Sequence, residues 1–161
     1  MSVNFGEERE GKKKMLALHF FHSQRIGMIR NKIVVRYQDG RILKGFTGDF
    51  APNKEFFHLT PMDAPPGTKP LDVRMADLKA VFFVKDLGGN PKRDERREFD
   101  SSKPVIGRKI QVLFKDGETL LGTTQGYQPN RPGFFLIPAD AGSNNERCFV
   151  VSAATQEIRI V

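Results

Sequence analysis

The side chains that could do chemistry in this 161-residue chain are scattered, and few have a chemical partner nearby in the sequence. His19 and His22 have a spacing that could place two imidazoles on one metal ion, but no carboxylate or cysteine stands close enough to complete the site. We therefore interpret both as packing histidines and predict no metal site. Cys148 is the single cysteine, so an intramolecular disulfide is excluded and a buried thiol is expected.

No segment has the order of residues that a catalytic site needs. Residues 64–70, APPGTKP, have the composition of a phosphate-binding loop but lack its Gly-Lys-Ser/Thr order. Pro70 would also prevent the helix whose amino terminus should face the phosphate, so a hairpin loop is predicted here. Since the sequence contains no pair of nucleophile and base, the chain is predicted not to be an enzyme and to need no cofactor.

Two arginines, Arg93 and Arg97, lie four residues apart in the segment KRDERREF. Paired guanidinium groups suit a phosphate or the edge of a guanine. Their spacing resembles that of the arginine pair that precedes the barrel in PilZ domains, which bind cyclic-di-GMP. The rest of the PilZ pattern, Asp/Asn-x-Ser-x-x-Gly, is not matched, because Val105 stands where the glycine belongs. Sensing of a cyclic dinucleotide through Arg93 and Arg97 is one alternative function.

The net charge of +7 also suggests an anionic partner, but its position argues against a folded basic groove. Residues 1–31 carry +3, residues 32–86 and 87–108 carry +2 each, and residues 109–161 are neutral overall. Most of the excess therefore belongs to a tail and a connector, where solvated charge is the simpler interpretation.

An internal repeat is the strongest signal in the sequence. Residues 35–54, VRYQDGRILKGFTGDFAPNK, return 77 positions later as VLFKDGETLLGTTQGYQPNR. When Lys32 is aligned with Lys109, no gap is needed to the end of the chain, and 14 of the first 32 pairs are identical. Such agreement indicates an internal duplication.

Glycines at equivalent places of the two copies predict the same backbone features. Gly40 and Gly117 follow an aspartate between alternating runs, which is the chemistry of a tight hairpin turn. Gly45 and Gly122 fall inside a strand pattern, where a missing side chain permits a bend or a close backbone approach.

Alternation of apolar and polar residues predicts five short strands in each copy. In the first copy they fall near residues 32–38, 41–50, 55–61, 70–75 and 79–84, with counterparts 77 residues later. The predicted fold class is all-β: two tandem small five-stranded barrels from an internal duplication, with a short N-terminal helical segment. The predicted domains are residues 1–31 (tail and packing segment), 32–86 (copy 1), 87–108 (charged connector) and 109–161 (copy 2).

Positions that are apolar in both copies predict the two cores. They are Ile33/Ile110, Val35/Val112, Tyr37/Phe114, Leu43/Leu120, Phe57/Phe134, Leu59/Leu136, Val73/Val150, Val81/Ile158 and Phe83/Ile160. The other face changes from polar to apolar between the copies. Its polar residues in copy 1 are Arg36, His58, Thr60, Asp72 and Arg74, and their replacements in copy 2 are Leu113, Phe135, Ile137, Phe149 and Val151.

A sheet that is apolar on both faces must be covered on both. We therefore expect at least three of the five apolar replacements in copy 2 to be buried, by copy 1, by residues 15–30 or across a dimer, and we take them as candidate interface residues. Arg36, His58 and Arg74 of copy 1 are expected in solvent and are candidate ligand-binding residues.

The segments outside the copies carry little specific signal. Residues 12–22, KKKMLALHFFH, have a basic and then an apolar run, but the run is short and lacks a cleavage site, so export is not predicted. No stretch approaches the roughly 20 apolar residues of a membrane span, and a cytoplasmic protein is predicted. Residues 15–30 are predicted to form a helix, and residues 92–99 are a candidate short helix in an otherwise solvated connector.

Several segments resemble a bacterial family of uncharacterised proteins that carry this module singly or doubled. They are KIVVRYQDGRILKGFTGDFAPNK, FHLTP and DLKAVFFVKD in copy 1, and GTTQGYQPNRPGFFLIPAD and NNER in copy 2. The resemblance covers nearly everything from residue 31 onward and implies no established activity. Five strands with an Asp-Gly hairpin and a mid-strand glycine are also similar, at the level of fold, to Sm-like and SH3-like small barrels.

The function predicted from these features is a non-catalytic binding or regulatory module that docks a protein or nucleotide partner. A protein partner is favoured, and a dimer stays open. Sm-like binding of RNA or another nucleic acid is an alternative, because Arg36, His58 and Arg74 share a face with Phe82. Asp72 on the same face weakens that alternative, and the cyclic dinucleotide is the other one.

Overall fold

The computed structural model describes residues 30–89 and 93–161. His19, His22 and the predicted helix over residues 15–30, apart from Arg30, lie outside the described residues. Residues 31–161 form one compact unit. Within the described ranges, no helix has the length and apolar content that crossing a membrane requires.

Ten strands make up this unit, so the all-β prediction is confirmed. Copy 1 contributes β1 (Asn31–Tyr37), β2 (Ile42–Thr47), β3 (Phe56–Pro61), β4 (Leu71–Arg74) and β5 (Leu78–Val84), with the 3-10 turn η1 (Met75–Asp77) before β5. Copy 2 contributes β6 (Arg108–Phe114), β7 (Thr119–Thr124), β8 (Gly133–Pro138), β9 (Asn145–Val151) and β10 (Thr155–Ile160), with η2 (Ser152–Ala154) before β10. Each strand overlaps its predicted range.

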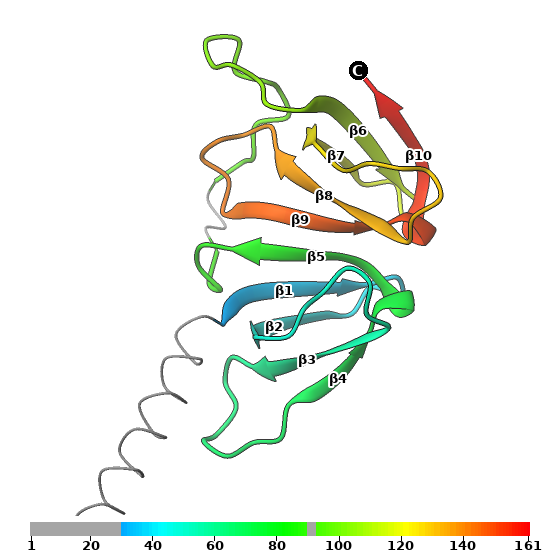
Figure 1. Cartoon of the computed structure of the whole chain (residues 1–161). Coiled ribbons are helices and arrows are strands. Elements are labelled where there is room, and N and C mark those ends of the chain that lie inside the picture. Colours follow the sequence, from blue (N-terminus) through cyan, green and yellow to red (C-terminus); the bar gives the residue numbers. More distant parts are fainter. Residues whose placement is uncertain (1–29, 90–92) are drawn as a thin grey trace, which may run out of the picture. The chain divides into compact units, whose positions relative to one another are not determined.

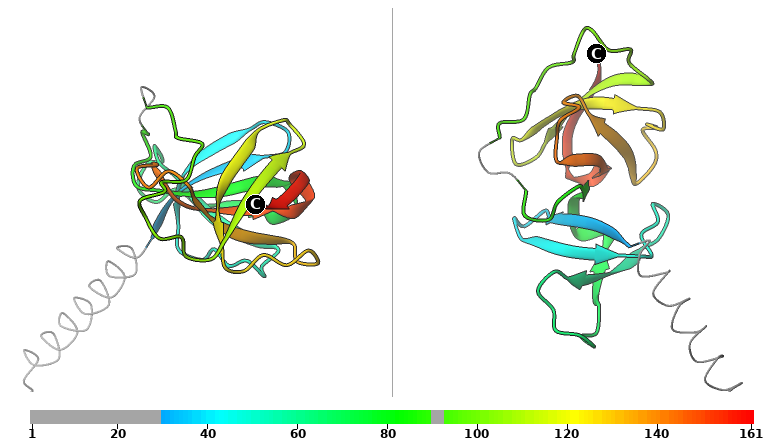
Figure 2. Two further views of the ribbon diagram at one scale, coloured as in Figure 1. Left: turned by 90° about the horizontal axis from the view of Figure 1, so that it is seen from above. Right: turned by 90° about the vertical axis from the view of Figure 1, so that its left-hand side faces the viewer.

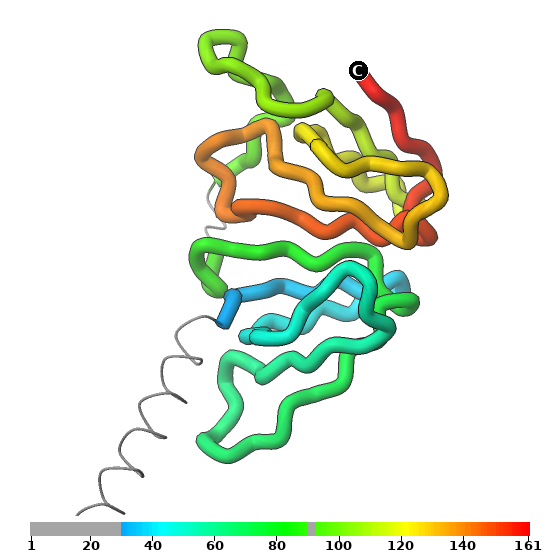
Figure 3. Tube along the Cα trace, in the orientation of Figure 1, coloured from blue at the N-terminus to red at the C-terminus, as the bar shows by residue number. Residues whose placement is uncertain are grey.

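One antiparallel sheet joins both copies, in the strand order β10-β6-β7-β8-β9-β5-β1-β2-β3-β4. At its centre β5 pairs with β9, from Ala80 opposite Val150 to Val84 opposite Asn145. These strands are far apart in the sequence but lie side by side (Figures 1 and 3). Figure 2 shows the two copies on opposite sides of this pair. Closure of each copy into a barrel of the SH3-like or Sm-like kind stays a prediction.

The paired glycines have the backbone roles that the sequence predicts. Gly40 and Gly117 have φ angles of 96° and 93°, which a hairpin turn of this kind requires and a side chain disfavours. A Cβ at Gly45 would lie 2.1 Å from the carbonyl oxygen of Thr60, and one at Gly122 would lie 2.2 Å from a carbonyl oxygen of β8. Both mid-strand glycines therefore permit a close approach of neighbouring backbones.

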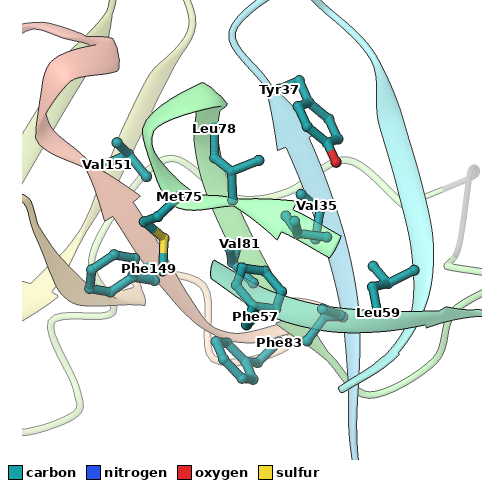
Figure 4. Close-up of a cluster of buried hydrophobic side chains, with 12 residues drawn as sticks. Val35, Tyr37, Phe57, Leu59, Met75, Leu78, Val81, Phe83, Phe149 and Val151 are labelled. Carbon is teal, nitrogen blue, oxygen red and sulfur yellow. The ribbon is translucent and has the colours of Figure 1, made fainter. Parts of the chain in front are cut away.

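Two apolar cores lie on opposite faces of the central strands, and Figure 4 shows the first of them. Successive side chains of a strand point to opposite faces, so β5 serves both: Val81 and Phe83 enter the first core, and Ala80 and Phe82 enter the second. All seven residues of β5 are buried as a result. The first core contains Ile33, Val35, Tyr37, Phe57, Leu59, Val73, Met75, Leu78, Val81 and Phe83 of copy 1 with Phe149 and Val151 of copy 2.

All but four of the predicted core residues are buried. Leu43, Leu120 and Ile158 are half-buried and pack against the cores. Ile160 was wrongly assigned, because half of its surface is exposed. It lies on β10, which ends the sheet and pairs only with β6, so no further strand covers it.

The candidate helix over residues 92–99 is wrong for its described part, which contains no helix. The N–H of Arg96 donates to Asp140 at 2.9 Å, and Nη2 of Arg93 donates to the same carboxylate at 2.8 Å. The hydroxyl of Ser143 donates to a glutamate of the connector. These bonds fix the connector to the loop before β9 in place of the internal bonds of a helix.

Asp140 makes stability depend on pH. The pKa of this nearly buried carboxyl is lowered from 3.8 to about 2, and the main cause is the hydrogen bond from the N–H of Arg96. Hydrogen bonds from Gly142 and Arg93 lower the pKa further. Since the folded-state pKa is the lower one, the carboxylate stabilises the fold above about pH 4, and this contribution of about 2 kcal/mol is lost as the pH falls toward 2. We expect Asp140→Asn to be less stable at neutral pH and to show a flatter acid decline. Urea unfolding at several pH values measures this, and parallel pH profiles of the two proteins would contradict it.

Candidate functional site

The three candidate ligand residues of copy 1 do not form one free cationic site. Arg36 lies on β1, and its Nη1 donates to Oε2 of Glu118 in copy 2 at 2.7 Å. His58 and Arg74 are exposed on the neighbouring strands β3 and β4, but His58 is bound by carboxylates. The cationic surface expected for phosphate binding is therefore largely neutralised.

His58 lies between two carboxylates that close the outer face of copy 1. Its Nδ1 is 2.6 Å from Oδ2 of Asp49, and its Nε2 is 3.1 Å from Oδ1 of Asp72. The hydrogen bond to Asp49 is the main cause that raises the pKa of His58. Burial alone would raise the pKa of Asp49, but bonds from His58 and Thr47 outweigh it and lower that pKa. The three side chains thus satisfy one another.

A buried lysine joins the two copies, and no sequence pattern predicted its role. Lys79 is 3% exposed, and its Nζ donates a hydrogen bond to Oδ2 of Asp116 at 2.6 Å. The same Nζ also donates to Glu118, whose carboxylate accepts a second hydrogen bond from Arg36. The bond from Lys79 is the main cause that lowers the pKa of Asp116. The ammonium also lies 4.7 Å from the ring centroid of Phe114. This ion group fixes the Asp-Gly turn of copy 2 against β5.

The connector arginines do not converge on one cavity. Arg93 is in an ion pair with Asp140 and lines a hollow beside it. Arg97 lines a different cavity, of about 340 Å³, whose walls include Glu95 and Glu118. Carboxylates in both walls oppose the phosphates of a dinucleotide.

The candidate interface residues of copy 2 have unequal surroundings. Phe149 and Val151 are buried, at 1% and 3% exposure, Leu113 and Phe135 are half-buried, and Ile137 is 54% exposed. The expectation of at least three buried residues is therefore not met. Copy 1 covers β9 through β5 and partly covers β8, where Phe50 and Phe83 contact Phe135. Ile137 at the end of β8 stays exposed.

A groove of about 470 Å³, which we name the β8 groove, runs along β8 and β9. Its walls are mostly apolar and include no acidic residue. Arg131 and Arg147 are exposed, and neither guanidinium has an ion pair or a hydrogen bond to the residues that the structure describes. The groove is lined by Pro52, Thr123, Thr124, Gln125, Gly126, Arg131, Gly133, Phe134, Phe135, Ile137, Arg147 and Phe149.

Aromatic rings form the base of the β8 groove. The ring centroids of Phe135 and Phe149 are 5.2 Å apart, and that of Phe50 lies 5.3 Å from Phe149. The guanidinium carbon of Arg147 lies 4.2 Å from the ring centroid of Phe83 and 4.9 Å from that of Phe135. This stacking holds the charged group beside an apolar surface.

The equivalent place in copy 1 is filled by its own side chains. We name Asp49, His58 and Asp72 the His58 group. In the aligned copy 2, Gly126 replaces Asp49, and Phe135 and Phe149 of the groove replace the other two. A Cβ at Gly126 would have nothing within 4 Å. The two copies therefore differ at one place, which is closed and polar in copy 1 and open and apolar in copy 2.

Sequence reasoning found the apolar residues of the groove but missed its two arginines. Phe135, Ile137 and Phe149 were identified because they replace polar residues of copy 1. Arg131 and Arg147 replace a lysine and a proline, and neither belongs to an alternating pattern. No sequence signal singles them out, since Glu146 immediately precedes Arg147.

Among the described residues, no group of three or more His, Cys, Asp or Glu side chains could hold a metal ion. Cys148 is buried, which raises the pKa of its thiol and leaves no exposed nucleophile there. Comparison with curated proteins and with solved structures found no match. The model of a protein family described as a family of unknown function (DUF6982) matches residues 29–161, and the chain therefore belongs to that family.

Proposed function

We propose that the chain is a non-catalytic binding module, built from two small SH3-like or Sm-like barrels, and that it docks a protein partner in the β8 groove. The observation that carries the proposal is the difference between the copies at this place. Copy 1 is closed by the His58 group, whereas copy 2 exposes Ile137 and half-exposes Phe135 beside two arginines that have no ion pair or hydrogen bond within the described ranges. Apolar surface with arginine beside it is typical of protein interfaces. A cytoplasmic location stays a prediction.

Binding of RNA on the polar face of copy 1 is supported less well by the charges. Recognition of single strands needs cations free to meet phosphates beside stacking rings. On copy 1, Arg36 is engaged by Glu118, and the carboxylates of Asp49 and Asp72 flank His58. Titration of labelled single-stranded RNA at two salt concentrations tests this alternative, which salt-dependent binding would favour.

Peptides selected on the full-length chain from a random-peptide display library test the proposal. Ile137→Thr gives copy 2 the residue that copy 1 has at this place, and it should weaken the selected peptides about tenfold, because the lost apolar contact is worth about 1–2 kcal/mol. Calorimetric titration measures the Kd values.

Ile160→Thr is the matched control, because Ile160 is similarly exposed on β10 and does not line the groove. Its peptide affinity should equal that of the unchanged chain. Selection of no peptide, or an equal loss of affinity in both variants, would overturn the proposal.

A further inference from the structure

Copy 1 shows what chemistry its backbone offers at the place of the groove. Oδ1 of Asp49 accepts the N–H of His58 at 2.9 Å and the hydroxyl of Thr47 at 3.2 Å. Lys54 lies beside this carboxylate and donates to the Asp49 carbonyl at 3.2 Å. A carboxylate of the loop between β2 and β3 thus satisfies a backbone N–H of β3.

Copy 2 keeps the donors of that arrangement but lacks the carboxylate, since Gly126 stands in its place. The pairing of β7 with β8 ends at Thr123 and Ile137, so Phe135 lies beyond the last pair. Its carbonyl faces β7, because it accepts the Thr124 hydroxyl at 2.8 Å. The N–H of Phe135 faces the same side, which in copy 1 is the side where Asp49 accepts the equivalent N–H of His58.

The pattern of bonds to β9 agrees with this orientation. The N–H of Ser152 donates to the carbonyl of Pro132 at 2.9 Å. Since residues of a strand face alternate edges, Phe134 and Leu136 also turn their backbone groups to β9, and Phe135 turns away from it. The N–H of Phe135 therefore points to the side where a carboxylate meets the equivalent N–H of copy 1, and it can donate there to an acceptor of the partner.

The charges around this N–H favour an anion. In the aligned copies Arg131 replaces Lys54, and it lines the groove together with Arg147, whose guanidinium stacks on Phe135. No acidic residue lines the groove to neutralise them. Arginines without a counter-charge at a partly apolar wall bind carboxylates strongly.

We propose that the β8 groove binds an aspartate or glutamate side chain of an extended segment of the partner protein. The partner's carboxylate takes the position that Asp49 has in copy 1, bonded to the Phe135 N–H between Arg131 and Arg147. A neighbouring apolar side chain of the partner packs against Phe135 and Ile137. This inference rests on the proposed function and adds the chemistry of the partner.

Peptides from the display selection, used with the full-length chain, provide the test. Replacing their acidic residues by Asn or Gln, one at a time, should weaken one position about 10- to 100-fold, since a charge-assisted hydrogen bond is lost. In ¹⁵N-labelled chain, the acidic peptide should move the amide proton of Phe135 downfield, and its amide counterpart should not.

A substitution in the chain gives an independent readout. Gly126→Asp supplies the carboxylate that copy 1 has, so it should fill the subsite and weaken the acidic peptides about tenfold while the chain stays folded. Gly126→Asn, which has the same shape without the charge, is the matched control and should weaken them much less.

The outcomes separate the two proposals. Selected peptides that bind equally well without their acidic residues would overturn the carboxylate inference and leave the proposed function standing. Displacement of the acidic peptides by millimolar inorganic phosphate, with no effect of acetate, would also overturn it and assign the subsite to phosphate. Selection of no peptide at all would overturn both.

Discussion

Phe149→Ala is expected to lower the free energy of unfolding by about 3–5 kcal/mol. Phe149 is 1% exposed, and it is one of the copy 2 residues that pack in the first core with residues of copy 1. Its ring centroid lies 5.3 Å from that of Phe50 and 5.2 Å from that of Phe135, so the cavity would be walled by rings. These rings cannot fill it unless β5 and β9 move. Urea unfolding followed by circular dichroism measures the loss.

Phe56→Ala is the control for this prediction. Phe56 is 46% exposed on β3, so truncating it should cost less than about 1 kcal/mol. Similar losses in the two variants would mean that the packing between β5 and β9 contributes little to stability.

Neutralising both acids of the junction is expected to cost about 3–5 kcal/mol. Asp116→Asn with Glu118→Gln would leave the Lys79 ammonium, whose side chain is 4% exposed, without a counter-charge. A buried cation that keeps only neutral partners retains most of its desolvation penalty. Chemical denaturation at neutral pH measures the loss.

Lys79→Met should cost clearly less than the double acid change. The side chains of Asp116 and Glu118 are 49% and 37% exposed, so water can solvate them when the lysine is gone. Methionine also fills the space of the buried lysine stem. Combining all three substitutions should recover most of the loss, and the resulting cycle isolates the coupling. Equal costs of the lysine and acid changes would show that the Lys79 ammonium reaches water.

The strands and turns could be predicted because each rests on local chemistry. Gly40 and Gly117 adopt the positive φ that an Asp-Gly hairpin needs, and the alternation around them sets which residues point inward. The hairpin turns then fix the register between neighbouring strands. The repeat doubled this information, since a core position had to be apolar in two places.

The pairing of β5 with β9 could not be read from local chemistry, because no turn connects the two strands. A signal was nevertheless present in residues 80–84, AVFFV, since a continuous apolar run is typical of a strand covered on both faces. The counterpart in copy 2, β10, alternates polar and apolar residues and lies at the edge of the sheet. Comparing these two strands would have indicated which one is central.

The candidate site was predicted only in its apolar part. Phe135, Ile137 and Phe149 differ from copy 1 in polarity, which a repeat alignment reveals. The replacement of Asp49 by Gly126 is also visible in that alignment, but the side to which the Phe135 N–H points depends on where the pairing of β7 and β8 ends. The end of a pairing is a property of the fold, so the sequence did not contain it in readable form.

The shared central strand has a consequence for how the chain is made. The ribosome releases β5 before β9 exists, because about 60 residues of connector and copy 2 lie between them. At about 5–20 residues per second, copy 1 waits several seconds with an apolar, unpaired edge. Two nascent chains on one messenger could pair through this edge and aggregate. Synonymous codons that slow translation after residue 84 should therefore lower the yield of soluble protein more than the same codons placed after residue 151.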